Sequence, residues 1–589
     1  MHLPAATNSI VAQVVRAWSL MGLFWAAAHP ATDGLKIPQT NSPIRGLNPD
    51  DVRLWRTTPA RSRYARVAVE LNRRTCDRAR RSRDARFDGR FFIGVTSTGV
   101  YCRPICPARA PKDEHIRYFP TAAAAEAAGY RPCLRCRPEA SPGTPAWLGT
   151  SGVVSRALRL VGEGALDGNG VDALADRLGM TARHLRRLFL QHLGATPLEV
   201  AHTRRLHFAK KLLDETTLAF NQVAWASGFG SVRRFNGQIR RTYARTPTAL
   251  RRLARQHAAA APECYRFRLA YRPPYDWEAV LSFLAARAIP GVESVEHSRY
   301  RRTITIDGAD GAIDVSRLES GAALCLDVRF PDPRALLSIV ERVRRVFDLG
   351  ADPAAIAEHL CADRLLRAPL ARHPGIRMPG AWDGFELAVR AILGQQISVR
   401  AASTLAGRIV SMFGAPVTDA RRGEAASGGG EPGRLFPTPA RLADAAIERA
   451  GVMTARAEAI RALARHVLDG SIAFGPCIDS RARISALSAL PGIGDWTAEY
   501  IAMRALGEPD AFPRGDLVLR RLTGLTAREL DRRSDAWRPW RAYAVMLLWQ
   551  SVVDDEDRAW RMSHARGDGS TVHDRDHRGA RVVAANGAR

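Results

Sequence analysis

The chain has 589 residues, 46% of which are hydrophobic, and it carries a formal net charge of +28. This length and apolar content predict several folded domains, and the charge indicates a polyanion such as nucleic acid as the partner. Because the basic residues are almost all arginine, charge alone does not identify that partner. No segment beyond the N-terminal region is apolar for long enough to cross a membrane, so we exclude a membrane protein and expect a soluble one.

Residues 1–65 are expected to be a disordered extension or a mis-called start of translation. The stretch from Val14 to Ala28 has the layout of a secretory signal, but its positive end is the single Arg16. Secretion also conflicts with the reduced cysteine cluster that follows. We therefore expect a cytoplasmic protein of bacterial type that associates with the nucleoid.

Four of the nine cysteines form two short pairs, Cys102 with Cys106 and Cys133 with Cys136. Two close pairs presented by turns are typical of a tetrahedral Zn²⁺ site with four thiolate ligands. The spacing therefore predicts that these four residues bind zinc. Disulfides would need an oxidising compartment, and the other cysteines are scattered singly, as in a reduced protein.

The residues around these cysteines are those of a known family. The stretches FDGRFFIGVTSTGVYCRPICPAR (87–109) and AGYRPCLRCRPE (128–139) closely resemble the N-terminal zinc domain of Ada-type adaptive-response proteins, over residues 66–140. The resemblance implies that Cys102, as both ligand and nucleophile, irreversibly takes a methyl group from a methylphosphotriester in DNA. A zinc-bound thiol stays deprotonated near neutral pH, which suits this attack.

Methylation of Cys102 has an electrostatic consequence. Four thiolates on one divalent ion carry a net charge of about −2, which repels phosphate, and methylation removes one of the negative charges. The affinity for DNA should therefore rise after the transfer. The alternative is a zinc ion that only holds a small domain together, and both roles are compatible.

Two helix-turn-helix units are predicted within residues 150–256. In the first, the turn at Gly179 precedes a helix that begins after Thr181, and in the second, the turn at Gly228 precedes a helix capped by Ser231. Arg, His and Gln side chains near the start of such helices can read base edges in the major groove. The candidate DNA-binding residues are Arg183, His184, Arg187, Arg233, Arg234 and Gln238.

The stretch GFGSVRRFNGQIRRTYARTP (228–247) resembles the second half of an AraC-type regulator domain. The resemblance implies a transcription activator that binds promoter DNA, with RNA polymerase as a further partner. An all-helical packing module without DNA contacts is the alternative.

Residues 264–375 are predicted to form an α+β domain. The stretch YRFRLAYRPPYDWEAVLSFLAARAIPGVESV (265–295) indicates a strand, a proline turn and a helix, and further strands follow around 302–306 and 323–328. This segment resembles the N-terminal domain of AlkA-type alkylbase DNA glycosylases. The resemblance continues through DGFELAVRAILGQQISVRAASTLAGRIV (383–410).

Residues 376–552 are expected to form an all-α glycosylase domain. Within LPGIGDWTAEY (490–500), Gly492 and Gly494 allow a hairpin between two helices to approach a DNA phosphate closely. Together with AFPRGDLVLRR (511–521), this stretch resembles the helix-hairpin-helix glycosylase superfamily, which implies Asp516 as the catalytic carboxylate. Such a carboxylate stabilises an oxocarbenium-like sugar and guides water to its anomeric carbon. The alternative, Asp516 as a helix N-cap, is compatible with that role.

Three aromatic residues, Trp496, Tyr500 and Trp549, match positions that line the base pocket in this superfamily. Aromatic faces suit cationic alkylated bases, because positive charge strengthens stacking on an electron-rich ring, although packing is the alternative for each residue. The domain contains no lysine that could form a Schiff base, so we expect a monofunctional N-glycosylase. The resemblance places Gln396 where this family has an aliphatic residue that fills the gap left by the flipped base, so Gln396 departs from the pattern, and Ile397 is the alternative for that role.

The expected fold class is a multidomain chain, mainly α with α+β parts, that ends in a disordered tail at 553–589. The expected function combines an alkylation sensor, a transcription activator and a glycosylase of the DNA-3-methyladenine glycosylase II type. Double-stranded DNA, as alkylated and promoter sites, is the expected partner, and Zn²⁺ is the expected cofactor. One alternative is a regulator with an inactive glycosylase domain, and another is a glycosylase whose zinc and helix-turn-helix parts only tether it to DNA.

Overall fold

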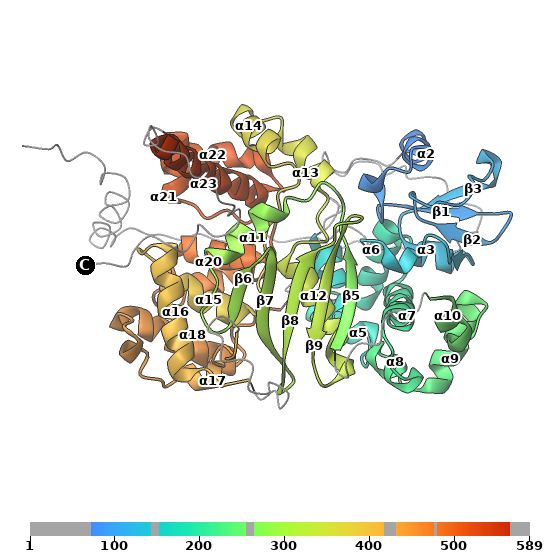
Figure 1. Cartoon of the computed structure of the whole chain (residues 1–589), viewed down its shortest axis with the longest axis horizontal. Coiled ribbons are helices and arrows are strands. Elements are labelled where there is room, and N and C mark those ends of the chain that lie inside the picture. The colour runs from blue at the N-terminus through green and yellow to red at the C-terminus, as the bar shows by residue number, and fades with distance from the viewer. Residues whose placement is uncertain (1–71, 143–151, 255–263, 418–431, 476–479, 566–589) are drawn as a thin grey trace, which may run out of the picture.

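The computed structural model describes residues 72–142, 152–254, 264–417, 432–475 and 480–565. Figure 1 shows an N-terminal domain (blue) and a helical domain (teal and green) on one side, a five-stranded sheet in the middle, and the C-terminal helices (orange and red) on the other side. Within the described residues, no helix combines the length and the apolar character needed to cross a membrane. The multidomain, mainly helical fold class is confirmed.

Two predicted segments lie wholly or partly outside the described residues. These are the extension at 1–65 and the part of the predicted tail beyond 565. The disordered tail expected from residue 553 differs from the structure, because the last helix continues to Ala565. The segment contains no glycine or proline before residue 566, so nothing in it breaks a helix that has already formed.

The N-terminal domain is a small four-stranded sheet flanked by helices. The strand order is β3-β1-β2-β4, with β1 antiparallel to β2 and β3, and β2 parallel to β4. All residues of β1 are buried because both faces of this strand are covered by apolar side chains. The elements are α2 (Arg73–Arg81), β1 (Phe92–Val95), β2 (Val100–Cys102), β3 (Ile116–Phe119), α3 (Ala122–Ala127) and β4 (Arg131–Pro132).

The second domain is all-helical and contains the two predicted helix-turn-helix units, on either side of the long helix α7. Gly179 and Gly228 both adopt positive φ at the turns, where a residue with a Cβ would be strained. Thr181 and Ser231 cap the second helix of each unit, and the Ser231 cap was predicted. The helices are α4 (Gly152–Gly162), α5 (Val171–Arg177), α6 (Ala182–Leu193), α7 (Pro197–Glu215), α8 (Phe220–Ala226), α9 (Val232–Tyr243) and α10 (Pro247–Leu253).

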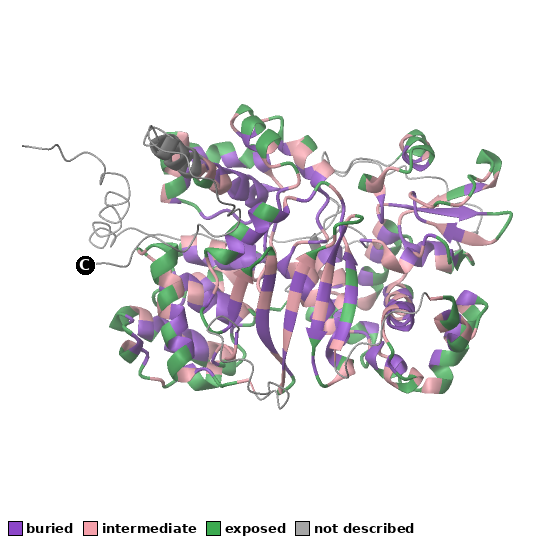
Figure 2. Ribbon diagram, in the orientation of Figure 1, coloured by how far each residue is buried: buried purple, intermediate pink, exposed green. Residues whose placement is uncertain are grey.

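The third domain is built on an antiparallel sheet with the order β5-β9-β8-β7-β6. The predicted strand, turn and helix at its start are confirmed. Figure 2 shows buried residues in β7 and β8, which lie inside the sheet, while exposed residues gather on the outer helices of the molecule. The elements are β5 (Cys264–Ala270), α11 (Trp277–Ala285), β6 (Glu293–Glu296), β7 (Arg299–Ile306), β8 (Ala309–Arg317), β9 (Ala323–Arg329) and α12 (Leu336–Val346).

The C-terminal domain consists of helices packed around two apolar clusters. Helices α19 and α20 form the predicted hairpin, and the long helix α23 contacts both α14 and α21. The helices are α15 (Gly384–Leu393), α16 (Val399–Phe413), α17 (Pro439–Leu442), α18 (Thr454–Leu468), α19 (Ser480–Ser488), α20 (Asp495–Arg504), α21 (Leu517–Thr523), α22 (Ala527–Ser534) and α23 (Arg541–Ala565). Helices α13 (Pro353–Leu360) and α14 (Arg364–Arg372) come before the predicted boundary at residue 376 and pack against this domain.

Polar contacts join the helical domain to the C-terminal domain. From α4, the Arg156 guanidinium donates to Ser480 Oγ at 2.7 Å and lies 3.3 Å from Glu508 Oε2. Arg159, on the same helix, donates to the carbonyl of Leu506. A cavity of about 410 Å³ lies at the same junction and is lined by residues of all the domains, but not by Asp516.

Candidate functional sites

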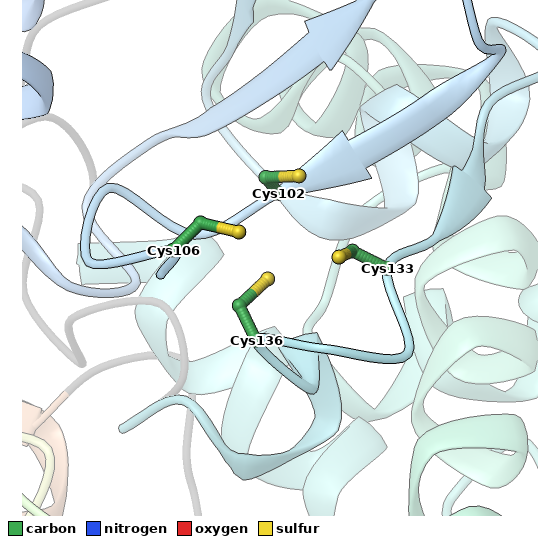
Figure 3. A group of neighbouring side chains, drawn as sticks. All are labelled: Cys102, Cys106, Cys133 and Cys136. Carbon is green, nitrogen blue, oxygen red and sulfur yellow. The ribbon is translucent and has the colours of Figure 1, made fainter. Parts of the chain in front are cut away.

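The four predicted zinc ligands come together in the N-terminal domain. Cys102 ends β2 and Cys133 follows β4, and the parallel pairing of these two strands places the two cysteines side by side. Cys106 and Cys136 are supplied by the loops that follow. Figure 3 shows the four side chains pointing toward a common centre, and their sulfur atoms all lie within 4.8 Å of one another.

The donor set fits a tetrahedral metal site. Zinc–sulfur bonds of about 2.3 Å place the sulfurs of a regular tetrahedron about 3.8 Å apart, within the spread observed here. As whole residues, Cys133 and Cys136 are buried, whereas Cys102 and Cys106 are partly exposed. The cluster can therefore hold a metal ion, and Cys106 is the one of its four ligand groups that is not buried.

Arg103 supports the cysteine cluster, and sequence reasoning does not identify it. Its side chain is buried, forms an ion pair with Asp88, and donates to the carbonyl oxygen of Cys136 at 3.0 Å. Its backbone N–H lies 3.4 Å from Cys136 Sγ. A buried guanidinium next to the thiols offsets part of the negative charge of a thiolate cluster. The only indication of this role in the sequence is that Arg103 directly follows Cys102.

A buried polar network connects the strand of Cys102 to α7. The Tyr101 hydroxyl donates to Glu126 Oε1 at 2.8 Å and lies 2.9 Å from Nε2 of His207 on α7. Thr203, also on α7, donates to the other oxygen of Glu126 at 2.7 Å. Because Tyr101 has no exposed surface, these bonds fix the N-terminal domain directly against the helix between the two helix-turn-helix units.

The predicted DNA-reading residues lie on the second helix of each helix-turn-helix unit. Phe235 and Ile239 are fully buried in α9, so the opposite side of that helix faces outward. The side chains of α6 divide in the same way around buried Leu185 and Phe189. Arg183, His184, Arg187, Arg233 and Arg234 are exposed, and Gln238 is half-buried.

Asp516 lies at the start of α21 and is 5% exposed. Its Oδ1 accepts a hydrogen bond from the backbone N–H of Leu519 at 2.8 Å, so the residue is an N-cap. Its Oδ2 accepts from Trp496 Nε1 at 2.8 Å, and Trp549 Nε1 lies 3.4 Å from Oδ1. Asp516 is therefore a cap and also the common acceptor of two of the predicted pocket aromatics.

The three predicted pocket aromatics form one cluster. The rings of Trp496 and Tyr500 are stacked, with centroids 5.3 Å apart and an interplanar angle of 6°. Trp549, from α23, lies 6.2 Å from Tyr500. All three residues are half-buried, so they combine apolar surface with access from outside. Flat rings beside a buried carboxylate are suited to hold a planar base near a reactive acid.

The two hairpin glycines, Gly492 and Gly494, have different surroundings, and glycine suits each position for a different reason. Gly492 has a φ of +80°, and an added Cβ would lie 2.7 Å from the Cβ of Ala459. Gly494 is the N-cap of α20, with open space around its Cα and no capping side chain. The first amides of α20 are therefore free of a side-chain cap, which suits an approach to phosphate oxygens.

The turn between α15 and α16 presents Gln396 at the surface. Gln396 is exposed and has a φ of +57°, an uncommon conformation for a residue with a side chain. Its neighbour Gln395, which sequence reasoning does not identify, donates to the carbonyl of Gly492 at 2.7 Å and to Thr497 Oγ1 at 3.1 Å. The turn is therefore attached to the hairpin, while the half-buried Ile397 is less available.

Four stretches of the chain match described protein families, in the order that the sequence predicts. Residues 75–139 match the metal binding domain of Ada, 174–253 a helix-turn-helix domain, 266–383 the AlkA N-terminal domain and 389–532 the HhH-GPD superfamily of base excision DNA repair proteins. These matches confirm the resemblances on which the predictions depend.

A relative in Mycobacterium tuberculosis has the same arrangement over most of its length. That protein, named a probable bifunctional transcriptional activator/DNA repair enzyme AlkA, is 44% identical over 485 residues, which cover 81% of this chain and 96% of the relative. The chain belongs to this Ada/AlkA family. Its C-terminal half is a glycosylase domain of the AlkA type.

Two Escherichia coli proteins are similar to parts of this Ada/AlkA family member. DNA-3-methyladenine glycosylase 2 is 35% identical over 312 residues, which cover 50% of this chain and 100% of that protein. The bifunctional transcriptional activator/DNA repair enzyme Ada is 38% identical over 116 residues, or 20% of this chain and 31% of that protein.

Proposed function

We propose that this protein excises alkylated purines from DNA at Asp516, accepts methyl groups from DNA phosphotriesters at Cys102, and regulates transcription through its helix-turn-helix domain. The observation that carries the proposal is the buried Asp516 carboxylate, which accepts hydrogen bonds from two aromatic residues at the position of a base pocket. The four-cysteine cluster on the same chain supports the second activity. The family of the chain is consistent with both.

Excision follows from the chemistry of a carboxylate near a flipped nucleotide. A base stacked on the aromatic cluster leaves with the electron pair of its glycosidic bond, and the Asp516 carboxylate stabilises the positive charge that develops on the sugar. Water then adds to the anomeric carbon and gives up a proton, which the carboxylate can accept. The domain contains no lysine, so the reaction ends at an abasic site without cleavage of the strand.

The test of excision is base release from methylated DNA by the wild type and by Asp516→Asn. Asparagine keeps an oxygen that can cap α21 but loses the charge, so we expect release of 3-methyladenine to fall by about 100-fold or more, within the range of a lost electrostatic contribution. Asp383→Asn is a matched control, because Asp383 caps α15 in the same way and is not a member of the aromatic cluster. Equal rates for the wild type and Asp516→Asn would reject the proposal.

Methyl transfer is proposed at Cys102. The cysteine sulfur attacks the methyl carbon of a phosphotriester, a carbon–sulfur bond forms, and the carbon–oxygen bond breaks with its electron pair left on the phosphate oxygen. A bound zinc ion, held by Cys102, Cys106, Cys133 and Cys136, would keep the thiols deprotonated near neutral pH. Arg103 supports the cluster by holding Cys136 through its carbonyl oxygen.

The test of methyl transfer is peptide mass mapping after incubation with DNA that carries methylphosphotriesters. We expect one added methyl group per chain, located on Cys102. Cys361 is an exposed cysteine outside the cluster and serves as an internal control that should stay unmodified. Methylation on Cys106 instead of Cys102, or none at all, would contradict the assignment.

Regulation is proposed to follow from the charge change at the cluster. Loss of one thiolate charge reduces repulsion from DNA phosphates, so methylated protein should bind duplex DNA more tightly, with a larger effect at low salt. Anisotropy measurements before and after methylation test this expectation. Unchanged affinity would instead favour a glycosylase that uses the zinc and helix-turn-helix domains as tethers. RNA polymerase as a further partner stays a prediction.

A further inference from the structure

Three arginine side chains gather behind the aromatic cluster, around the hydroxyl group of Tyr500. Arg504 comes from α20, the helix that also carries Tyr500, Arg390 comes from α15, and Arg287 follows α11. The Arg504 guanidinium donates to the Tyr500 hydroxyl at 2.9 Å. Arg287 and Arg504 lie over the ring of Phe283, 3.8 and 4.6 Å from its centroid. The result is a strongly positive environment at one end of the base pocket.

These arginines differ in how far their positive charges are balanced by neighbouring carboxylates. Arg390 lies 3.0 Å from Glu293 Oε2 and 3.3 Å from Glu386 Oε1, so its charge is balanced. Arg504 is 4% exposed, and its hydrogen bonds within the described part of the chain go to the carbonyls of Pro379 and Gly380 and to Tyr500. A buried cation surrounded by neutral acceptors is costly. Among these acceptors, the phenol alone can become an anion.

The surroundings of Tyr500 favour that anion. Burial alone would raise the pKa of the phenol, but the guanidiniums of Arg504, Arg287 and Arg390 lower the pKa of Tyr500 to about 8. Trp496, on the same helix as Tyr500, and Trp549, on α23, face the ring, and the carboxylate of Asp516 is held beyond them by their indole N–H groups. Glu293 and Glu386 are engaged by Arg302 and Arg390 rather than directed at the phenol.

The charge state of this group matters for the substrate. Bases alkylated on a ring nitrogen, such as 3-methyladenine in DNA, are cationic, and uncompensated guanidiniums behind the pocket would repel them. A phenolate removes that repulsion and makes the stacking ring richer in electrons. Binding of a cationic base and loss of the Tyr500 proton should therefore favour each other, which is a reciprocal linkage.

We propose that Tyr500, hydrogen-bonded to the buried Arg504, is a specificity-determining residue whose phenolate form makes the pocket prefer cationic alkylated bases over neutral ones. The inference rests on the proposed glycosylase function. It assigns to the hydroxyl group a role that the aromatic ring alone cannot perform. Because the phenolate population rises with pH, the preference for cationic bases should rise as well.

The test compares the wild type with Tyr500→Phe, which keeps the stacking ring. The rates at which both proteins excise 3-methyladenine and the neutral lesion 1,N6-ethenoadenine are measured from pH 6.5 to 9. For each base and pH, the wild-type rate is divided by the rate of Tyr500→Phe. For 3-methyladenine, the ratio of the wild-type rate to the variant rate should rise by about tenfold between pH 6.5 and 9. This is the effect expected if binding of the cationic base lowers the pKa of Tyr500 by about one. For ethenoadenine, the ratio should stay level. A level ratio for both bases would overturn the proposal.

A second readout does not depend on enzyme activity. The ultraviolet absorbance of tyrosinate, taken as wild type minus Tyr500→Phe, should titrate well below the ordinary phenol range of about 10. A midpoint at or above that range would also overturn the proposal. If no base of either kind is released while the low midpoint is observed, the proposed glycosylase function fails and the phenolate assignment stands. The two failures are therefore distinguishable.

Discussion

Gly492 has a backbone conformation in the left-handed region and lies close to Ala459, so any residue with a Cβ would be strained at this position. Gly492→Ala should lower the free energy of unfolding by about 1–3 kcal/mol, because a Cβ is strained at this φ and meets Ala459. It should also weaken binding to DNA that contains an abasic-site analogue, since the hairpin must shift. Denaturant unfolding and anisotropy measure the two effects.

Gly494→Ala is the matched control for this prediction. Gly494 has a φ of −83° and open space around its Cα, so alanine fits without strain. The unfolding free energy should change little. A loss of stability as large as that of Gly492→Ala would show that the hairpin as a whole resists substitution, and that neither the positive φ nor the contact with Ala459 is the cause.

Single residues could be predicted from the sequence where local spacing determines their chemistry. The two cysteine pairs are of this kind, and the structure brings their sulfurs together as expected. Asp516 comes instead from the resemblance to the helix-hairpin-helix glycosylase superfamily, and its catalytic role stays a prediction. The hydrogen bonds from Trp496 and Trp549 to Asp516 were not predictable, because their donors lie 20 and 33 residues from the acceptor. Contacts of that kind depend on how helices pack, which a single sequence does not encode in any local pattern.

At the scale of elements, His373 joins three helices through two carboxylates. Its Nδ1 lies 2.8 Å from Asp276, the N-cap of α11, and its Nε2 lies 2.8 Å from Asp554 on α23. The hydrogen bond to Asp276 raises the pKa of His373. Because the pKa of His373 is raised in the folded state, its charged form stabilises the protein. This contribution to the free energy of unfolding is complete below the unfolded-state pKa of about 6.5 and is lost as the pH rises through the folded-state pKa.

His373→Gln should therefore destabilise the protein more at pH 6 than at pH 9. We expect a loss of about 1–3 kcal/mol at the lower pH, the usual size for hydrogen bonds to a charged group. Thermal unfolding at both pH values measures the difference, and replacement of the exposed His297 by Gln serves as the control. An equal loss at both pH values would mean that the charge of His373 makes no contribution.

Helices and strands were predictable where local rules determine them. Apolar spacing and turn glycines located the helix-turn-helix units, and the cap predicted at Ser231 agrees with the structure. The order of the five-stranded sheet was not predictable, because strand pairing joins distant segments such as 264–270 and 323–329. The end of α23 was predicted too early, since a polar composition does not by itself stop a helix.

At the scale of the whole molecule, Glu508 is one of several polar groups at the junction between the two halves, which also share an apolar core. Glu508 accepts from Ser480 Oγ at 2.5 Å and pairs with Arg156 across 352 positions of sequence. Glu508→Ala should lower the unfolding free energy by about 1–3 kcal/mol, because it removes a carboxylate from a half-buried guanidinium. Base release from short duplexes should stay unchanged. Calorimetry should show the helical and C-terminal domains unfolding less cooperatively.

Glu319→Ala is the control for the junction, because Glu319 is exposed and lies on the sheet domain. Identical calorimetric profiles for both variants would mean that the junction adds no measurable stability. Sequence reasoning recognises each half by its motifs but does not predict how the halves pack, since the contacts between them join residues far apart in the sequence, such as Arg156 and Glu508.

The short strand β2 has two neighbouring residues with opposite surroundings. Tyr101 points into the protein and touches Glu126 and α7, while the sulfur of Cys102 lies among those of the other three cluster cysteines. A methyl group on Cys102 would thus lie one residue away from Tyr101, whose side chain is hydrogen-bonded to the helix-turn-helix domain. In the proposed function, the methyl-accepting residue and the residue that contacts α7 are therefore neighbours in one strand.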